Sequence, residues 1–291
     1  MGNASHALVK TMKKISKGLL ILLLLIISTV GIFYNSTVTT DSSTNIYGDV
    51  VTFFGRGIYY RESMFKGPIY VGTDIVMMVI IITFIGLTFL YKDKENKYKI
   101  DIAYYTVFTY YTASLVFGTM MNELFLIYII AFSLASWRLL IILVSLDYSA
   151  ISERLKTIHV SKGHLVFLGI AGASTLVWLF EIVAVVFNGR PSDVIGMSAT
   201  EPTYIIDLAF VLPACILSII YLKKRKAIGA VLSLMMTALL SSIGLIVVSQ
   251  TLVQRYYGVS IATSEFVVYV GSFIVLSIVA SVFVKKSLKM L

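Results

Sequence analysis

The chain has 291 residues, of which 58% are hydrophobic and only 13% are charged, and its mean hydropathy is +0.91. Because soluble domains carry about 25% charged residues, this composition excludes an ordinary soluble globule. The net charge of +9 lies in short segments between apolar runs, whereas a nucleic-acid-binding protein carries its basic residues on a folded soluble face. We therefore expect an all-α polytopic membrane protein that is surrounded by a lipid bilayer and has no nucleic-acid partner.

Eight apolar runs are long enough to cross a hydrocarbon core, which requires about 20 residues. The first run follows four lysines, as in a signal peptide, but no small-residue cleavage site follows it, so we expect a retained helix. Asn122 separates the third run from the fourth, because asparagine caps helix starts well; seven spans are the alternative. The predicted spans of this single membrane domain (1–291) are 18–34, 72–91, 102–121, 124–146, 164–187, 204–222, 227–250 and 263–284.

The positive charges predict the topology. With the N-terminus inside, 18 of the 24 lysines and arginines fall on the cytoplasmic side, five fall outside, and Arg138 lies within a span. Because cytoplasmic segments are enriched in lysine and arginine, this division favours two cytoplasmic termini in the plasma membrane. The same basic segments are expected to attract anionic lipid at the cytoplasmic face. They give no indication of oligomeric state.

The longest loop, residues 35–71, is then outside. Its first part is rich in serine and threonine, which predicts a flexible chain. In its second part Val50, Phe54, Ile58 and Arg61 recur at helical spacing. We expect a short helix over residues 50–64 that lies on the outer membrane surface, either as an anchor or as a lid over an outward-facing pocket.

Two acidic residues lie more than one helical turn inside predicted spans. Asp207 is one and a half turns beyond Pro202, a helix-start signal, and Pro213 after it removes a backbone donor and predicts a kink. Glu181 lies about six residues from the outer end of its span. A carboxylate in hydrocarbon is costly and is by default a functional candidate. The alternative is pairing with a neighbouring tyrosine or arginine that specifies packing.

Three further acids, Asp74, Glu123 and Glu265, are expected in the first turns of their helices. Helix capping would explain each of them, because the helix dipole favours a negative charge there. The predicted topology nevertheless places all five acids toward one face of the membrane. We therefore expect Asp207 and Glu181 to share an outward-open cavity with at least one of the other three.

The third predicted span carries a polar stripe at helical spacing, formed by Tyr105, Thr109, Thr112, Thr119 and Asn122. It could line a path inward from the acidic end or form interhelical hydrogen bonds. On the seventh span, Ser233, Thr237, Ser241 and Gly244 form a small-residue face that favours close packing. Arg138 is expected either to extend its side chain toward the inner membrane surface or to pair with an acid such as Asp101 or Asp147.

Several function classes are disfavoured by missing motifs. The single cysteine, Cys215, excludes an intrachain disulfide, and the three histidines lack the spacing of a zinc site. The sequence contains no P-loop, Rossmann glycine pattern, H-E-x-x-H or G-x-S-x-G. ATP-driven transport by this chain and catalysis by a histidine or cysteine nucleophile are therefore not expected.

Three stretches of the chain carry a family resemblance. They run through Gly57, Tyr60, Ser63 and Gly72-Thr-Asp74; through Tyr104-Tyr105, Phe117-Gly118, Asn122-Glu123, Tyr128 and Phe132-Ser133; and through Tyr204-Ile-Ile-Asp207-Leu-Ala-Phe-Val-Leu-Pro213 and Lys223-Lys-Arg225. Together they resemble a group of prokaryotic polytopic membrane proteins to which no activity is assigned. The resemblance implies the same topology and draws attention to Asp74, Asn122, Glu123 and Asp207. It implies no reaction.

These patterns predict a membrane protein with an outward-facing acidic site that serves proton- or cation-linked transport or ion sensing. No cofactor is predicted, and a hard divalent cation or protons are the ligands that carboxylates would suit. The alternatives are a membrane enzyme that uses a carboxylate pair on a lipid or small substrate, and a non-catalytic scaffold subunit. The candidate ligand-binding residues are Asp207, Glu181, Asp74, Glu123, Glu265, Tyr204, Asn122 and Tyr105.

Overall fold

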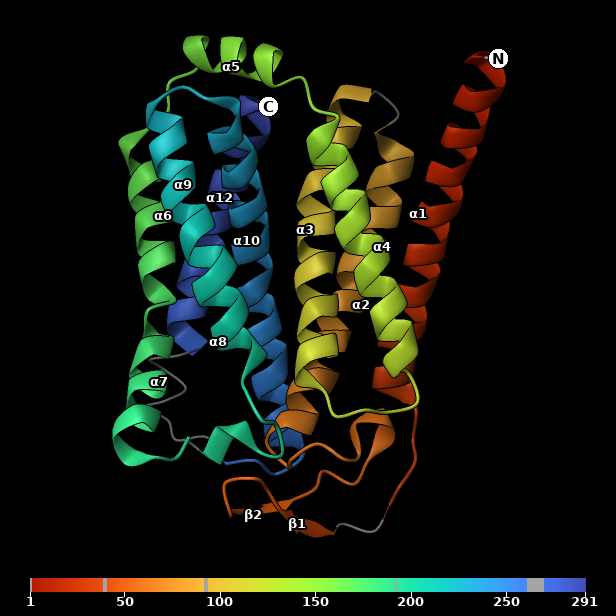
Figure 1. Ribbon diagram of the computed structural model, residues 1–291, viewed down its shortest axis with the longest axis vertical. Coiled ribbons are helices and arrows are strands. Elements are labelled where there is room, and N and C mark those ends of the chain that lie inside the picture. Colours follow the sequence, from red (N-terminus) through yellow and green to blue (C-terminus); the bar gives the residue numbers. More distant parts are fainter. Residues whose placement is uncertain (1, 39–40, 92–93, 192, 261–269) are drawn as a thin grey trace.

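Figure 1 shows the computed structural model, an elongated bundle of helices that run side by side between two ends. The structure describes residues 2–38, 41–91, 94–191, 193–260 and 270–291. The short helix α5 (Tyr148–Thr157) crosses one end, where both chain termini lie, and a β-hairpin lies at the other. We refer to these as the α5 end and the hairpin end.

Seven helical segments of the described chain are long and apolar enough to cross a membrane, so the all-helical, multi-pass prediction is confirmed. Two of these segments contain more than one element, because α6 continues into α7 and α8 continues through η3 into α9. The seven are α1 (Gly2–Phe33, apolar from Lys14), α2 (Lys66–Leu90), α4 (Phe125–Val144), α6–α7 (Lys162–Ser174 and Val177–Asn188), α8–η3–α9 (Pro202–Ile206, Asp207–Val211 and Leu212–Lys223), α10 (Ala227–Tyr256) and α12 (Gly271–Met290).

The remaining long helix, α3 (Lys94–Gly118), is as long as α2 but is not among these seven. Its first turns carry charges, and its later turns carry tyrosines and threonines. Several of these polar residues are buried: Tyr105 and Thr112 have no exposed surface, and Tyr111 is 2% exposed. The low hydropathy of α3 therefore follows from its position among α2, α4 and α10 in the bundle.

Two apolar clusters form the core. One joins α1, α2, α3 and α4 with the outer loop, and the other joins α5, α6, α9, α10 and α12 with the start of α3. α10 packs against α2, α3, α9 and α12 and thereby holds the two halves together. Its approach to α12 is close, because a Cβ on Gly244 would lie within 3 Å of both side-chain atoms of Ser277. The small-residue face of this helix thus lies in a packed interface.

The prediction of a helix over residues 50–64 is wrong. The segment instead contains an antiparallel hairpin of β1 (Ser42–Thr44) and β2 (Val50–Thr52), with Ser42 opposite Thr52. Only the one-turn helix η1 (Gly57–Tyr59) forms here. Gly55 and Gly57 have positive φ angles of 67° and 59°, which the interior of a right-handed α-helix does not contain. These two glycines therefore prevent one continuous helix over residues 50–64, despite the helical spacing of the apolar residues.

The hairpin end is closed by contacts between distant segments. Asn45 shapes the hairpin turn, because its Oδ1 accepts the backbone N–H groups of Tyr47 and Asp49, both at 2.9 Å. Its Nδ2 donates to the carbonyl of Gly196 at 2.9 Å, beside η2 (Asp193–Ile195). The serine- and threonine-rich part of the loop is thus ordered over its described residues by docking on the chain between α7 and α8.

The helix α5 has no counterpart among the predicted elements. Asp147 caps it by accepting the N–H groups of Ser149 and Ala150 at 3.1 and 2.9 Å. Ile151 and Leu155, four residues apart, are buried on one face. Its ten residues are too few to cross a membrane, and it lies across the α5 end of the bundle (Figure 1).

Candidate functional site

Asp74 is the most deeply enclosed acid that the structure describes. The prediction that it lies in a first helical turn is wrong, because α2 begins at Lys66 and not at residue 72. Asp74 is then ~12 Å along the axis from Lys66, and it has no exposed surface. Pro68, which suits the first turn of a helix, was the sequence signal for this earlier start.

Two tyrosines hold the carboxylate of Asp74. The Tyr59 hydroxyl donates to Oδ2 at 2.7 Å, and the Tyr111 hydroxyl donates to Oδ1 in a short hydrogen bond. Tyr59 belongs to η1 in the outer loop, whereas Tyr111 belongs to α3. Among the described residues, no lysine, arginine or histidine forms an ion pair with Asp74. Its burial is therefore compensated by neutral donors that join the loop to two helices.

An aromatic cluster surrounds this site. The Tyr59 ring stacks on Tyr70 with centroids 5.2 Å apart, and Tyr128 is completely buried beside them in the same core cluster. Asn122 reaches this cluster, because its Nδ2 lies 3.3 Å from the Tyr128 hydroxyl. Its Oδ1 accepts the backbone N–H of Leu124 at 3.0 Å and so forms the turn before α4. Asn122 thus serves a turn and the rim of the Asp74 site.

Asp207 occupies a second, similar site. It is 9% exposed and accepts hydrogen bonds from the Tyr110 hydroxyl and from the Trp178 indole Nε1, both at 2.9 Å. Trp178 stacks on Tyr204 with ring centroids 4.8 Å apart. As at Asp74, the described partners of the carboxylate are all neutral. The Tyr110 bond agrees with the alternative for Asp207, which was pairing with a neighbouring tyrosine or arginine, whereas the Trp178 bond was not predicted.

The backbone at Asp207 is irregular. Residues Asp207–Val211 form the π-turn η3, in which the N–H of Leu212 bonds to the carbonyl of Asp207. Pro213 lies just beyond it and removes one backbone donor from the helix, which is the disturbance the sequence predicted. The helix start at Pro202 is confirmed, because Glu201 caps it by accepting the N–H of Thr203. Such π-turns are frequent at functional sites.

The two sites meet at α3. Tyr110 and Tyr111 are consecutive, and consecutive helical residues point about 100° apart, so each tyrosine reaches a different neighbour. Asp74 and Asp207 therefore lie at the same level along α3, on different sides of it. α3, the long helix that is too polar to be among the seven apolar segments, thus supplies a hydrogen-bond donor to both buried aspartates.

The other predicted acids are placed less centrally. Glu123 precedes α4, which begins at Phe125, so the first-turn prediction is wrong for it too; it is exposed, with the Tyr60 hydroxyl 3.3 Å from its Oε1. Glu181 is half-buried on α7, three residues after Trp178. Glu265 lies outside the described residues. The shared cavity of Asp207 and Glu181 stays a prediction, and no described contact joins any two of these acids.

The polar stripe on α3 is used locally. Thr112 and Thr119 each bond to a backbone carbonyl one turn back on the same helix. Tyr105 lies toward the α5 end, where Arg138 donates to its hydroxyl at 2.8 Å. The expected acids of Arg138 have other partners, since Asp101 binds Lys17 at 3.0 Å and Asp147 caps α5. Tyr105 is therefore a structural partner of Arg138 and lies apart from the acidic sites.

A buried charged cluster at the hairpin end was not predicted. Glu62 is 2% exposed, and its Oε1 accepts the backbone N–H of Met120 at 2.6 Å. Lys66, 5% exposed, pairs with Glu201 at 2.7 Å and donates to Ser198 at 3.1 Å. These contacts join the outer loop and α2 to the turn after α3 and to the start of α8. Their partners are 58 and more residues apart, so no local pattern could reveal them.

Burial raises the pKa of Glu62 to about 7. The Met120 N–H and the positive charge of Lys66 oppose this effect, whereas the negative charge of Glu201 adds to it. Glu62 therefore changes its charge near neutral pH, at the junction that closes the hairpin end. Tyr59, also outside the spans, has its pKa raised well above its usual value by burial and then by Asp74, so its hydroxyl stays a donor.

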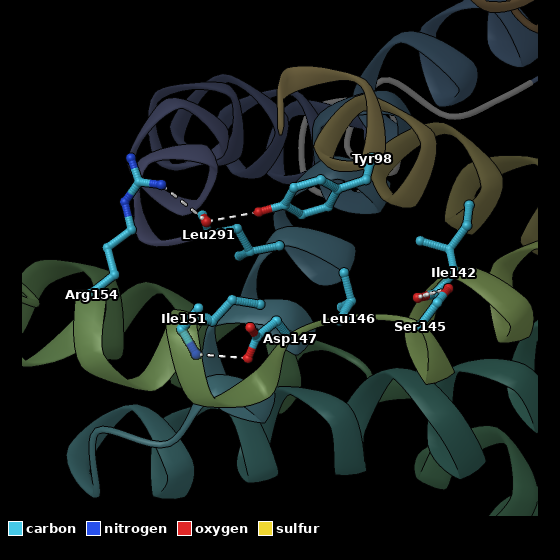
Figure 2. Close-up of a pocket in the computed structure, with 9 residues that line it drawn as sticks. Tyr98, Ile142, Ser145, Leu146, Asp147, Ile151, Arg154 and Leu291 are labelled. Atoms are coloured by element: carbon cyan, nitrogen blue, oxygen red, sulfur yellow. Dashed lines mark hydrogen bonds between the residues drawn. The ribbon is translucent and has the colours of Figure 1, made fainter. Parts of the chain in front are cut away.

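Two cavities of the described chain lie away from Asp74 and Asp207. One, of about 470 Å³, is at the α5 end; there the Tyr98 hydroxyl and Arg154 point at the backbone oxygen of Leu291 from two sides, at 2.8 and 3.2 Å (Figure 2). Asp147 also lines it but is occupied in capping α5. The polar side chains that line this cavity form hydrogen bonds with other groups of the chain. The second cavity is a groove between α6 and α12.

No group of three or more histidine, cysteine, aspartate or glutamate side chains within the described ranges could hold a metal ion. Asp74 and Asp207 are each single carboxylates among phenols and an indole. No family model, curated protein or solved structure matches the chain. The function must therefore be argued from these sites.

Proposed function

We propose that this chain is a multi-pass plasma-membrane protein that binds a proton at Asp74 and couples its binding to the outer loop, in proton-linked transport or proton sensing. One observation carries the proposal: a completely buried carboxylate is held by neutral hydroxyl groups, one of which comes from the loop.

The first supporting argument is energetic. An ionised carboxylate without a cationic partner is costly to bury, and binding a proton removes the charge. A tyrosine hydroxyl can both donate and accept a hydrogen bond. When Asp74 takes up a proton, its O–H becomes a donor that requires an acceptor, and we propose that the Tyr59 oxygen accepts it by turning its own O–H away from the carboxyl group. Protonation at Asp74 therefore changes the contact between Tyr59 and α2, and with it the docking of the loop.

The ligand set favours a proton over a hard divalent cation. Calcium takes six to eight oxygen ligands, and magnesium demands near-ideal octahedral geometry. Asp74 offers one carboxylate and two phenols, both of which already donate hydrogen bonds to it. Asp207 offers one carboxylate, one phenol and an indole N–H, which has no acceptor atom. A proton requires no further ligand.

We infer the orientation in the membrane from α3 and from the distribution of positive charge. We propose that α3 is an eighth span, because it runs beside α2 and α4 through the bundle (Figure 1). Eight crossings return the chain to its starting side, in agreement with both termini lying at the α5 end. Lysine-rich segments favour the cytoplasm, so we place the α5 end there and the hairpin outside.

Cysteine labelling tests this orientation. Ser43→Cys in the hairpin and Thr157→Cys at the end of α5 are both at exposed positions. The native Cys215 is completely buried, and replacing it with alanine removes any background. An impermeant maleimide added to intact cells should label residue 43 and spare residue 157 until the membrane is opened. The reverse pattern would contradict the proposed orientation.

Proton flux tests the function. The purified protein is reconstituted into vesicles that contain a pH-sensitive dye, with valinomycin and potassium to hold the membrane potential at zero. After an external acid pulse, the wild-type protein should acidify the lumen faster than Asp74→Asn. The control Asp41→Asn removes an exposed carboxylate in the outer loop and should behave as the wild type.

A scaffold role is the second candidate, because the described acids have different neighbours and no two are in contact. It predicts equal flux for all three proteins and a loss of thermal stability in Asp74→Asn. A sensor predicts equal flux as well, but with a pH-dependent protection of the outer loop from hydrogen exchange that Asp74→Asn abolishes. Equal flux together with pH-independent exchange would therefore refute the proton-binding proposal and leave the scaffold.

A further inference from the structure

A long apolar groove runs along the side of the bundle between α6 and α12. Its volume is about 800 Å³, and its walls are almost entirely apolar. Val166, Ile170 and Val275 are 58%, 59% and 63% exposed in it. Both helices belong to the segments that are long and apolar enough to cross a membrane. The groove therefore opens sideways to the hydrocarbon of the bilayer.

Glycines keep this groove open. Gly163 lines it near the start of α6, and Gly271 lines it at the start of α12. A Cβ added to either glycine would meet no heavy atom within 4 Å. These residues therefore border empty space, and a larger side chain at Gly163 would extend into the groove without striking the backbone.

The α5 end of the groove is positively charged. Lys162, the first residue of α6, is exposed next to Gly163. Lys286 is exposed on α12, and its Nζ lies 4.9 Å from the ring centroid of Phe283, which lines the groove. Neither lysine forms an ion pair with an acid in the part of the chain that the structure describes. Both lie where a membrane-spanning helix ends, which is the level of lipid headgroups.

We propose that this groove is a binding site for one anionic phospholipid, with an acyl chain along the walls and the phosphate between Lys162 and Lys286. Apolar walls open to the bilayer select a hydrocarbon chain, and two exposed lysines at one end select a negative headgroup. The site is independent of Asp74 and of the proton-binding proposal.

Native mass spectrometry of the detergent-purified protein tests this proposal. The probes are dioleoyl-phosphatidylglycerol and dioleoyl-phosphatidylcholine, which share their chains and differ in headgroup charge. The wild-type protein should retain one phosphatidylglycerol at a lower lipid concentration than any phosphatidylcholine. Gly163→Leu should remove this tight binding of phosphatidylglycerol. The double variant Lys162→Gln/Lys286→Gln should lose the preference between the two lipids, with roughly fivefold weaker phosphatidylglycerol binding per lysine.

Matched controls separate this site from general lipid adhesion. Gly86→Leu adds the same side chain at an exposed glycine of α2 that also has no neighbour within 4 Å. Lys223→Gln/Lys224→Gln removes two exposed lysines at the end of α9. Both controls should bind as the wild type does. If Gly163→Leu retains as much phosphatidylglycerol as Gly86→Leu, or if the two lysine pairs have equal effects, the proposed site is refuted.

Discussion

The carboxylate of Asp74 occupies the space that a side chain at Gly31 would need. A Cβ on Gly31 would lie 1.6 Å from Oδ2 of Asp74 and 3.3 Å from the Tyr59 ring. The missing side chain on α1 is therefore part of the Asp74 site. α1 thereby becomes the fourth element of the site, after α2, α3 and η1.

Gly31→Ala should displace the Asp74 carboxylate and weaken its bonds to Tyr59 and Tyr111. We expect a loss of thermal stability equivalent to about 1–3 kcal/mol, because overpacking a tight interior has this cost. Gly18→Ala on the same helix is the control, since a Cβ there meets nothing within 4 Å. Alanine favours helix over glycine, so the control should melt at the same temperature or higher. Equal melting of the two variants would contradict the close approach of Gly31 to Asp74.

Tyr59 and Tyr60 offer a matched pair of substitutions. Tyr59 is 1% exposed and bonds to Asp74, whereas the neighbouring Tyr60 hydroxyl lies 3.3 Å from the exposed Glu123. Tyr59→Phe removes a hydrogen bond to a buried carboxylate and should cost about 1.5–3 kcal/mol. Tyr60→Phe should cost less than about 1 kcal/mol, because its bond is exposed to solvent. Thermal melting in detergent measures both.

Hydrogen exchange adds a readout for the loop. Tyr59→Phe should increase exchange at the backbone N–H of Gly55, Gly57 and Glu62, which bond within the loop, and Tyr60→Phe should not. If Tyr59→Phe leaves both the melting temperature and the exchange of these groups unchanged, the Tyr59–Asp74 bond does not fasten the loop.

The sequence was sufficient for features that depend on local pattern. Membrane-length helices follow from runs of apolar residues, and the start of α8 follows from Glu201 and Pro202. The depth of Asp74 was missed because the start of α2 was placed by hydropathy, which ignores the buried residues Lys66 and Pro68. The hairpin was missed because positive-φ glycines, and not side-chain spacing, determine the path of the loop.

The partners of the acids could not be read from the sequence. Tyr110 is 97 residues from Asp207, and Tyr111 is 37 residues from Asp74. Helical spacing tells which residues share a face of one helix, but not which helix lies opposite that face. The sequence therefore identified Asp74 and Asp207 as candidates and left their tyrosine and tryptophan donors unassigned.

The raised pKa of Glu62 predicts that the stability of the folded protein depends on pH. Its pKa is about 7 in the folded protein and near 4.5 in the unfolded chain, so between these values the folded state binds more protons than the unfolded state. Stability should therefore fall as the pH rises from 4.5 through 7, by up to a few kcal/mol. The contribution of the neutral acid is fully present below pH 4.5 and is lost above pH 7.

Glu62→Gln keeps an acceptor for the Met120 N–H and cannot ionise. Its melting temperature in detergent should vary less with pH over this window than that of the wild-type protein, and above pH 7 the variant should be the more stable of the two. Asp41→Asn serves as the control for general charge effects, because Asp41 is an exposed acid of the same loop. Parallel pH profiles for the wild-type protein and Glu62→Gln would show that Glu62 does not titrate in this range.

Trp178 provides a direct optical reporter for Asp207. The chain has two tryptophans, and Trp137 is 61% exposed on α4, whereas the Trp178 indole donates to Asp207. In Trp137→Phe the emission comes from Trp178 alone. Because protonation of the carboxylate changes the electric field and the hydrogen bond at the indole N–H, the emission of this variant should change with pH in a single titration step. Adding Asp207→Asn should flatten that curve.

Glu181 lies three residues from Trp178 on α7. Adding Glu181→Gln to Trp137→Phe tests the prediction that Asp207 and Glu181 share a cavity. If they do, the titration midpoint shifts when Glu181 is neutralised. An unchanged midpoint in Glu181→Gln would separate the two acids and leave Asp207 in a site made by Tyr110, Trp178 and Tyr204.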